Sequence, residues 1–140
     1  MNRRKGLLAA GTLLAAPALA IDVTSADAKA ARALIEAQLA AFARDDANQA
    51  FSFAAPAIQT MFATPERFLA MVREQYPVVY RPAAVSFLQP EWIDGQLIQR
   101  VQMADAAGAP WIVVYQLERQ ADRSWRIAGC VAARAQGRST

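Results

Sequence analysis

The sequence of 140 residues has no histidine and a single cysteine, Cys130. These absences argue against a zinc site and against nucleophilic catalysis, because histidine and cysteine are the usual zinc ligands and histidine is the commonest base that activates a nucleophile. We therefore expect no cofactor and no metal site built on nitrogen or sulfur ligands. A lone cysteine forms no disulfide within the chain. Cys130 lies in a predicted strand, where we interpret it as a buried and inert thiol.

Long apolar runs are also scarce. The run near the start, Leu7 to Ala16, is shorter than the ~18 apolar residues that a membrane-spanning helix needs. It follows Arg3, Arg4 and Lys5 and leads to a small-residue ending at Ala20. This is the layout of a secretory signal that is removed from the mature protein.

We therefore expect residues 1–20 to be a signal peptide, cleaved near Ala20, and residues 21–140 to be one periplasmic domain with no stable membrane anchor. The Arg3-Arg4 pair, followed by two leucines, also resembles a twin-arginine signal for the export of folded proteins. Gly6 stands where that signal usually has a bulky residue, so the general export route stays open.

The predicted mature chain has no net charge. Residues 3–5 account for the whole formal net charge of +3, and the rest of the chain balances acidic against basic residues. No basic patch stands out, so we expect no nucleic-acid partner. A mature chain of about 120 residues is one domain by size and buries enough surface to fold without a disulfide or a metal.

The first half of the mature chain has helical spacing. A stripe of apolar residues predicts a helix that begins after Thr24, with Asp27 completing a capping arrangement, and ends near Asp45. The stripe contains Ala31, Leu34, Ile35, Leu39 and Phe42. We expect a second, shorter helix over residues 47–53, followed by a turn at Ala55-Pro56.

A third helix is predicted from Thr64, Pro65 and Glu66, which read as an N-cap, a proline at the first helical position and an acid in the first turn. This helix should end before Pro77. Beyond Pro82 the pattern changes to alternation and predicts four strands, at residues 84–88, 96–104, 111–119 and 124–132. The short links between them favour antiparallel pairing.

Alternation also divides the strand residues between two faces of the predicted sheet. The face expected to receive the helices contains Leu97, Val101, Met103, Trp111, Val113, Tyr115, Leu117, Trp125, Ile127, Gly129 and Val131. The other face mixes polar residues with apolar ones, and Cys130 belongs to it. That face is suited to solvent or to a partner, and we expect that it mediates a homodimer. Only the segment from about residue 134 reads as a frayed tail.

Four separated segments resemble a known family over nearly the whole mature chain. They are "FARDDANQAFSFAAP", "TPERFLAMV", "YPVVYRP" and "LERQADRSWRIAGC". Together they resemble the bacterial domain-of-unknown-function family 4864 and the nuclear transport factor 2-like (cystatin-like) cone fold. The resemblance implies an α+β fold in which N-terminal helices pack on a curved four-stranded antiparallel sheet. It implies no catalytic residue, because folds of this kind host both enzymes and non-catalytic binders.

The adjacent carboxylates Asp45 and Asp46 are the first candidates for acid and base chemistry. Neighbouring residues on a helix point about 100° apart, so the two groups do not converge on one substrate atom. Asp46 is suited to cap the helix that begins at Ala47, and Asp45 to be the solvated end of the preceding helix. The alternative is that Asp46 lines the mouth of a cavity.

The remaining candidates are ligand-binding residues. Tyr76, Tyr80, Arg81 and Trp92 cluster around the transition from helices to strands, where they would orient an acidic or amphipathic ligand or, alternatively, only pack. The cavity wall would include Trp111 and Tyr115.

Two hypotheses follow from these candidates. The first is a non-catalytic exported domain that binds a small apolar ligand or a protein partner. The second is an isomerase or dehydratase that uses one pocket acid, Asp46, with Tyr80 or Tyr115 as hydrogen-bond donor.

Overall fold

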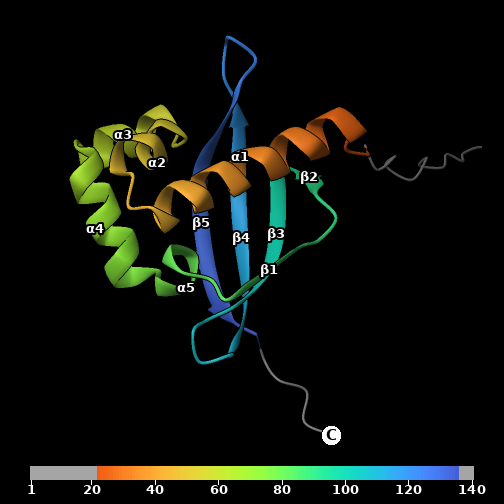
Figure 1. Ribbon diagram of the computed structural model, residues 1–140. Helices are drawn as coiled ribbons and strands as arrows, with labels where there is room; N and C mark the ends of the chain where they lie inside the picture. The colour runs from red at the N-terminus through yellow and green to blue at the C-terminus, as the bar shows by residue number, and fades with distance from the viewer. Residues whose placement is uncertain (1–21, 136–140) are drawn as a thin grey trace, which may run out of the picture.

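The structure of the chain, a computed structural model, describes residues 22–135. The predicted signal peptide and the end of the predicted tail lie outside these residues. The described part forms five helices followed by five strands (Figure 1). The helices are α1 (Ser25–Ala43), α2 (Ala47–Ser52), α3 (Pro56–Phe62), α4 (Pro65–Gln75) and α5 (Pro77–Tyr80). The strands are β1 (Ala84–Phe87), β2 (Glu91–Ile93), β3 (Gln96–Ala104), β4 (Pro110–Arg119) and β5 (Trp125–Arg134).

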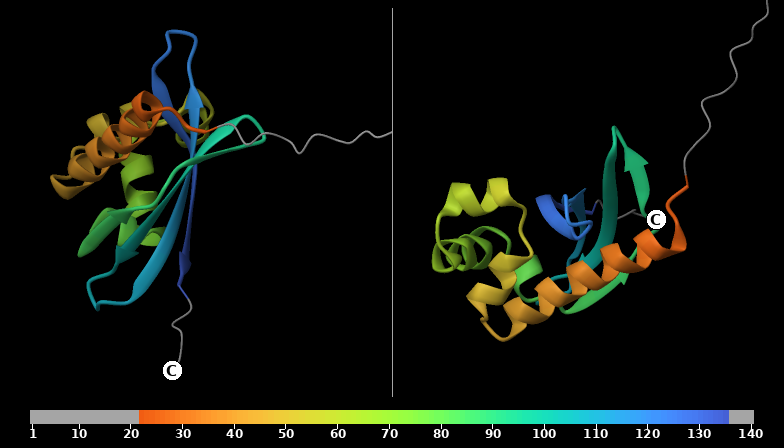
Figure 2. Two further views of the ribbon diagram at one scale, coloured as in Figure 1. Left: turned by 90° about the vertical axis from the view of Figure 1, so that its right-hand side faces the viewer. Right: turned by 90° about the horizontal axis from the view of Figure 1, so that it is seen from above.

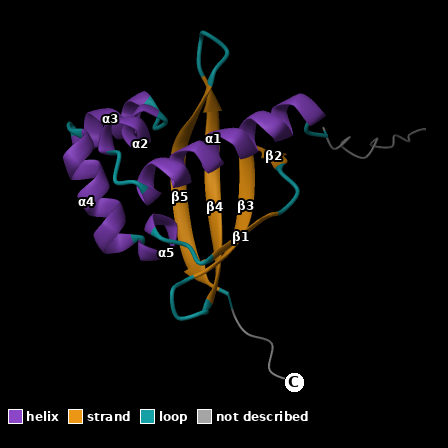
Figure 3. Ribbon diagram, viewed as in Figure 1, coloured by secondary structure: helices purple, strands orange, loops and turns teal. Residues whose placement is uncertain are grey.

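The strands form one antiparallel sheet in the order β1-β3-β4-β5, with β2 also paired to β3. Helix α1 crosses one face of this sheet, and α2, α3 and α4 gather beside β5 (Figures 1 and 3). The other face carries no helix of the described chain (Figure 2). The predicted α+β class with antiparallel pairing is therefore confirmed.

The sheet has one more strand than the sequence predicts. Strand β2 pairs with β3 beside β1, so both short strands share one edge of β3. They are separated around Pro90, which has no backbone N–H to donate to a ladder. The buried side chain of Gln99 fills the break, since its Nε2 donates to Leu88 O at 2.7 Å.

The predicted helix starts are confirmed at three caps. The side chains of Thr24, Asp46 and Thr64 each accept a hydrogen bond from a backbone N–H in the first turn of α1, α2 and α4. The short helices α3 and α5 are missing from the prediction. Both begin with a proline, at Pro56 and Pro77, where the sequence predicts a turn and a helix end. Proline is favoured at the first helical position, so each of these two prolines begins a new helix.

Strand β5 contains a β-bulge that changes the register against β4. Leu117 pairs with Ile127, whereas the adjacent Gln116 pairs with Gly129, which leaves Ala128 as the extra residue. A bulge of one residue reverses the alternation of every side chain that follows it.

The predicted faces of β5 are therefore right before the bulge and wrong after it. Val131, predicted to lie under the helices, is 62% exposed, and Gly129 lies against the side chain of Gln116, an outer-face residue. Cys130, predicted to face outward, lies on the side of the helices. Strand β5 continues to Arg134, near the position where the tail is predicted to begin.

The core lies between α1, α4 and the covered face of the sheet. Its fully buried side chains include Ile35 and Phe42 of α1, together with Leu97, Val113 and Leu117 of the sheet. None of the helices within residues 22–135 is long and apolar enough to cross a lipid bilayer.

Candidate functional site

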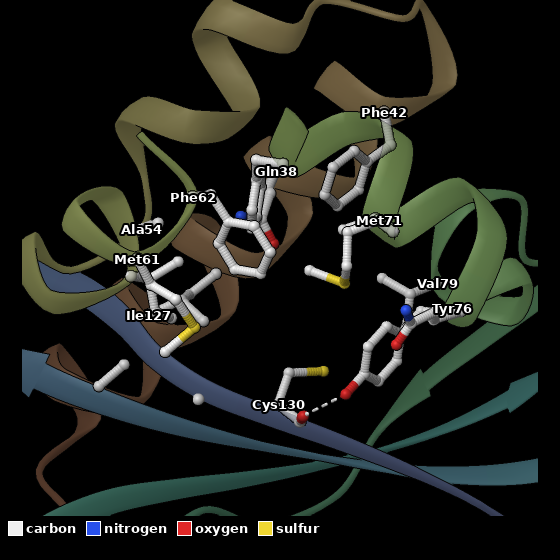
Figure 4. A pocket seen from close by; sticks show the side chains of 16 residues that line it. Gln38, Phe42, Ala54, Met61, Phe62, Met71, Tyr76, Val79, Ile127 and Cys130 are labelled. Carbon is white, nitrogen blue, oxygen red and sulfur yellow. Dashed lines mark hydrogen bonds between the residues drawn. The ribbon is translucent and has the colours of Figure 1, made fainter. Parts of the chain in front are cut away.

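A cavity of about 440 Å³ lies between α3, α4 and the bulged strand β5 (Figure 4). Its walls come mostly from apolar side chains. The lining residues are Gln38, Phe42, Ala54, Ile58, Met61, Phe62, Phe68, Met71, Val72, Gln75, Tyr76, Val79, Ile127, Ala128, Gly129 and Cys130.

The chain between α2 and α3 fixes one end of this pocket. Ala54 forms a parallel bridge to Ile127, in which Ile127 N donates to Phe53 O and Ala55 N donates to Ile127 O, both at 2.8 Å. This bridge occupies the open edge of β5 only at Ile127. The residues that follow it, 128–130, form part of the pocket wall, next to the bulge.

Aromatic rings and two methionines make the wall apolar and adaptable. The rings of Phe62 and Phe68 contact edge to face, with centroids 5.7 Å apart. The side chains of Met61 and Met71 both reach the pocket, and Met61 is 73% exposed, so it lies at the opening (Figure 4). Methionine is flexible and polarisable, which lets a wall of this kind adjust to the shape of a ligand.

Few polar atoms face the pocket, and those that do are neutral. Gln38 is 3% exposed; its Nε2 donates to Ala50 O at 3.1 Å, and its Oε1 points toward the pocket (Figure 4). The hydroxyl of Tyr76 donates to the backbone carbonyl of Cys130 at 3.3 Å. Burial raises the pKa of the Cys130 thiol from 9.0 to about 12, so that group stays protonated at neutral pH. Within residues 22–135, the lining includes no Asp, Glu, Lys or Arg.

Of the seven residues predicted to bind a ligand, only Tyr76 lines this pocket. Tyr80 and Arg81 lie at the junction of α1 and α5, where both bind Asp45. The Tyr80 hydroxyl donates to Asp45 Oδ1 at 2.5 Å, and Arg81 Nη2 lies 3.3 Å from Asp45 Oδ2. Arg81 also donates to Phe42 O, so it caps the end of α1.

The two aspartates at this junction have different contacts. Asp46 accepts from Gln49 N at 3.0 Å and caps α2, and it does not line the pocket. Asp45 has a φ of 55°, a left-handed conformation that aspartate tolerates better than most residues. The hydrogen bond from Tyr80, followed by the charge and hydrogen bond of Arg81, lowers the pKa of Asp45. Asp45 is therefore a tertiary contact and more than the solvated end of a helix.

The three other predicted residues pack elsewhere. Trp92 lies against Trp125 with ring centroids 6.0 Å apart, and Trp111 Nε1 donates to Asp105 Oδ2 at 2.9 Å. Tyr115 is 1% exposed, and its hydroxyl has no hydrogen-bond partner among the described residues. Burial, with a smaller effect of Cys130, raises the pKa of Tyr115 well above its ordinary value.

The sequence interpretation missed three of the residues that shape the pocket: Gln38, Met71 and Cys130. A signal existed for Gln38, since it lies three residues after Ile35 and four before Phe42, on the buried side of α1. No pattern signals the bulge that turns Cys130 inward. Nowhere in the described chain do three His, Cys, Asp or Glu side chains gather as a metal site would require.

Residues 24–140 match the family described as a domain of unknown function, DUF4864. The chain belongs to this family. No curated protein and no solved structure matches the chain. The family membership that the sequence segments indicate is therefore confirmed, whereas the likeness to the nuclear transport factor 2-like cone stays a prediction.

Proposed function

We propose that this domain binds a small apolar ligand, without catalysis, in the cavity between α3, α4 and β5. The observation that carries the proposal is an uncharged cavity of about 440 Å³ whose walls are aromatic, aliphatic and methionine side chains. Pockets for small molecules usually have volumes of ~300–1,000 Å³ and apolar walls with a few polar groups. Transfer of an apolar ligand from water into such a site is favourable because it removes apolar surface from water.

The alternative of an isomerase or dehydratase needs a carboxylate in the pocket. In the described part of the chain, the pocket lining includes none, and Asp46 hydrogen-bonds to the backbone of α2. Tyr80 donates to Asp45, and the Tyr115 hydroxyl is fully buried, so neither reaches this pocket as a donor. The geometry supports binding better than proton transfer.

We propose that binding takes place in the periplasm, after removal of residues 1–20. The signal layout around Arg3, Arg4 and Ala20 supports this location. Cell fractionation of the full chain tests it: the protein should appear in the periplasm and lack residues 1–20 by mass. Recovery of the intact chain from the cytoplasm alone would contradict it.

Equilibrium dialysis against naphthalene tests the binding proposal, because this probe is apolar and has no hydrogen-bonding group. We expect saturable binding of one molecule per chain. Substitution Met71→Trp should weaken it at least tenfold, since the larger ring fills the space into which Met71 points (Figure 4).

The matched control is Glu74→Trp, which adds the same ring at an exposed position of the same helix. It should leave naphthalene binding unchanged. No saturable binding to the wild-type chain, or equal binding by both variants, would show that the cavity is not a ligand site.

A further inference from the structure

The pocket contains one buried polar side chain whose acceptor is free. Gln38 occupies a core position of α1, with Ile35 and Phe42 as its buried neighbours on the same side. Its amide orientation is fixed, because Nε2 donates to Ala50 O at 3.1 Å. Oε1 is then directed toward the pocket (Figure 4), and no residue in the range 22–135 donates to it. The fully buried side-chain atoms without a partner in this part of the chain are the Tyr115 hydroxyl and Trp125 Nε1, so Gln38 Oε1 is open to the pocket, where water can donate to it. A ligand that displaces such water without supplying a donor leaves Oε1 unpaired, so a ligand that supplies a donor is favoured.

The second polar group of the pocket also presents an acceptor. The Tyr76 hydroxyl uses its single hydrogen to donate to Cys130 O at 3.3 Å. Toward a ligand, the Tyr76 hydroxyl can then act only as a hydrogen-bond acceptor. Gln75, the third polar residue, is exposed and therefore lies at the opening.

The charge of the lining restricts the ligand further. Among the residues that the structure describes, the wall has neither a cation that would pair with a carboxylate or phosphate nor a carboxylate that would pair with an amine. A charged group inside an apolar site without a partner carries a large desolvation cost. An anion would in addition face the two acceptors of Gln38 and Tyr76.

We propose that the ligand is a neutral, mostly apolar molecule with one hydrogen-bond donor, such as an alcohol or a phenol, and that Gln38 Oε1 accepts from that donor. This inference rests on the proposed function, and it names the chemical class that the same pocket selects. Gln38 is the residue that determines this selectivity.

Three probes of one shape test the inference: naphthalene, 1-naphthol and 1-naphthoate, compared by equilibrium dialysis at pH 7. A hydrogen bond of ordinary net strength makes 1-naphthol bind about three- to tenfold more tightly than naphthalene. The anion 1-naphthoate should bind at least about tenfold more weakly than 1-naphthol.

Two variants assign the effect to one residue. Gln38→Met keeps the side-chain length but removes Oε1, so its affinities for 1-naphthol and naphthalene should become equal. Tyr76→Phe should keep the preference for 1-naphthol. If Gln38→Met does not fold, Tyr76→Phe is the deciding variant, because it removes the other acceptor of the pocket wall. A preference for 1-naphthol that survives in Tyr76→Phe assigns that preference to Gln38, and a preference that is lost there would overturn the inference.

Naphthalene binding with no preference for 1-naphthol would overturn this inference and leave the proposed function intact. So would 1-naphthoate binding as tightly as 1-naphthol, or a preference that persists in folded Gln38→Met. Failure of all three probes to bind would refute the proposed function itself.

Discussion

Two tyrosine hydroxyls on the covered side of the sheet differ in their contacts. The Tyr76 hydroxyl donates to Cys130 O, whereas the Tyr115 hydroxyl is fully buried and has no partner in the part of the chain that the structure describes. An unsatisfied buried hydroxyl costs about 1–3 kcal/mol, while a made hydrogen bond contributes about 0.5–1.5 kcal/mol. The same substitution should therefore have opposite effects at the two positions.

We predict that Tyr115→Phe raises the free energy of unfolding by about 1 kcal/mol, because it removes the unpaired hydroxyl and keeps the ring. Tyr76→Phe should lower it by a similar amount. Urea denaturation of the three chains measures both changes. Destabilisation by Tyr115→Phe would mean that its hydroxyl does have a partner.

Asp45 makes the junction of α1 and α5 sensitive to acid. The Tyr80 hydrogen bond, and after it Arg81 and Arg73, lower the pKa of Asp45 below its ordinary value of 3.8. A carboxyl group whose pKa is lower in the folded state stabilises the fold above its unfolded-state pKa. That stabilisation is lost as the pH falls through the folded-state pKa.

We therefore predict that Asp45→Asn lowers the melting temperature at pH 6, and that the difference from wild type shrinks as the pH falls below 3.8 and through the lowered pKa of Asp45. Thermal melts followed by circular dichroism between pH 2 and 7 measure it. Tyr80→Phe, which removes the main cause of the lowered pKa, should reduce the same acid dependence. A melting-temperature difference between wild type and Asp45→Asn that stays constant from pH 2 to 7 would contradict the role assigned to Asp45.

Sequence reasoning at this scale identified residue types better than their partners. It placed Asp46 correctly as a cap, because capping depends on three or four consecutive residues. It left open whether Tyr80 and Arg81 orient a ligand or only pack, and it did not identify their partner, Asp45, which is 35 and 36 residues away in the chain. The contacts of Tyr80 and Arg81 with Asp45 depend on how α5 packs against α1, and the residue pattern within a single helix does not predict that packing.

At the scale of single elements, the start of α2 depends on Asp46. Its carboxylate accepts from Gln49 N at 3.0 Å, and α2 has only six residues, so the helix has few bonds of its own. We predict that Asp46→Ala lowers the free energy of unfolding by about 0.5–2 kcal/mol, whereas Asp46→Asn, which can still cap, has little effect.

Both Asp46 variants should bind naphthalene as the wild type does, because Asp46 does not line the pocket. Chemical denaturation and dialysis on the same samples separate the two properties. If a folded Asp46→Asn chain did not bind naphthalene, Asp46 would have to contact the ligand, and the hypothesis of an enzyme that uses Asp46 would again be supported.

The limits of alternation are clearest in β5. Period-two patterning assigned the covered face of β3 and β4 correctly, and it assigned Trp125 and Ile127 correctly. It failed for Gly129, Cys130 and Val131, because the bulge at Ala128 reverses the faces. The bulge lies within the pocket wall, so the feature that sequence patterning missed is the one that shapes the site.

At the scale of the whole molecule, one face of the sheet is left uncovered by the helices within residues 22–135 (Figure 2). Val131 is 62% exposed and Ile93 is 39% exposed, and both belong to the face that no helix of the described chain covers (Figure 2). The homodimer expected through this face stays a prediction.

If the dimer forms, light scattering should give twice the chain mass at high protein concentration, and Val131→Asp should return the chain to a monomer. Val131→Thr is the matched control, because threonine keeps the β-branched shape and adds no charge. A single-chain mass at every concentration would eliminate the dimer. Neither variant should alter naphthalene binding, since Val131 lies outside the pocket.

The most direct test of ligand binding is native mass spectrometry of the chain purified from the periplasm without denaturation. We predict a bound molecule that adds mass to the wild-type and Glu74→Trp chains, is absent from Met71→Trp and is removed by organic solvent. The extracted molecule should be neutral and carry a hydroxyl or N–H group. A wild-type chain that always has the mass of the polypeptide alone would contradict the proposal that this domain carries an apolar ligand.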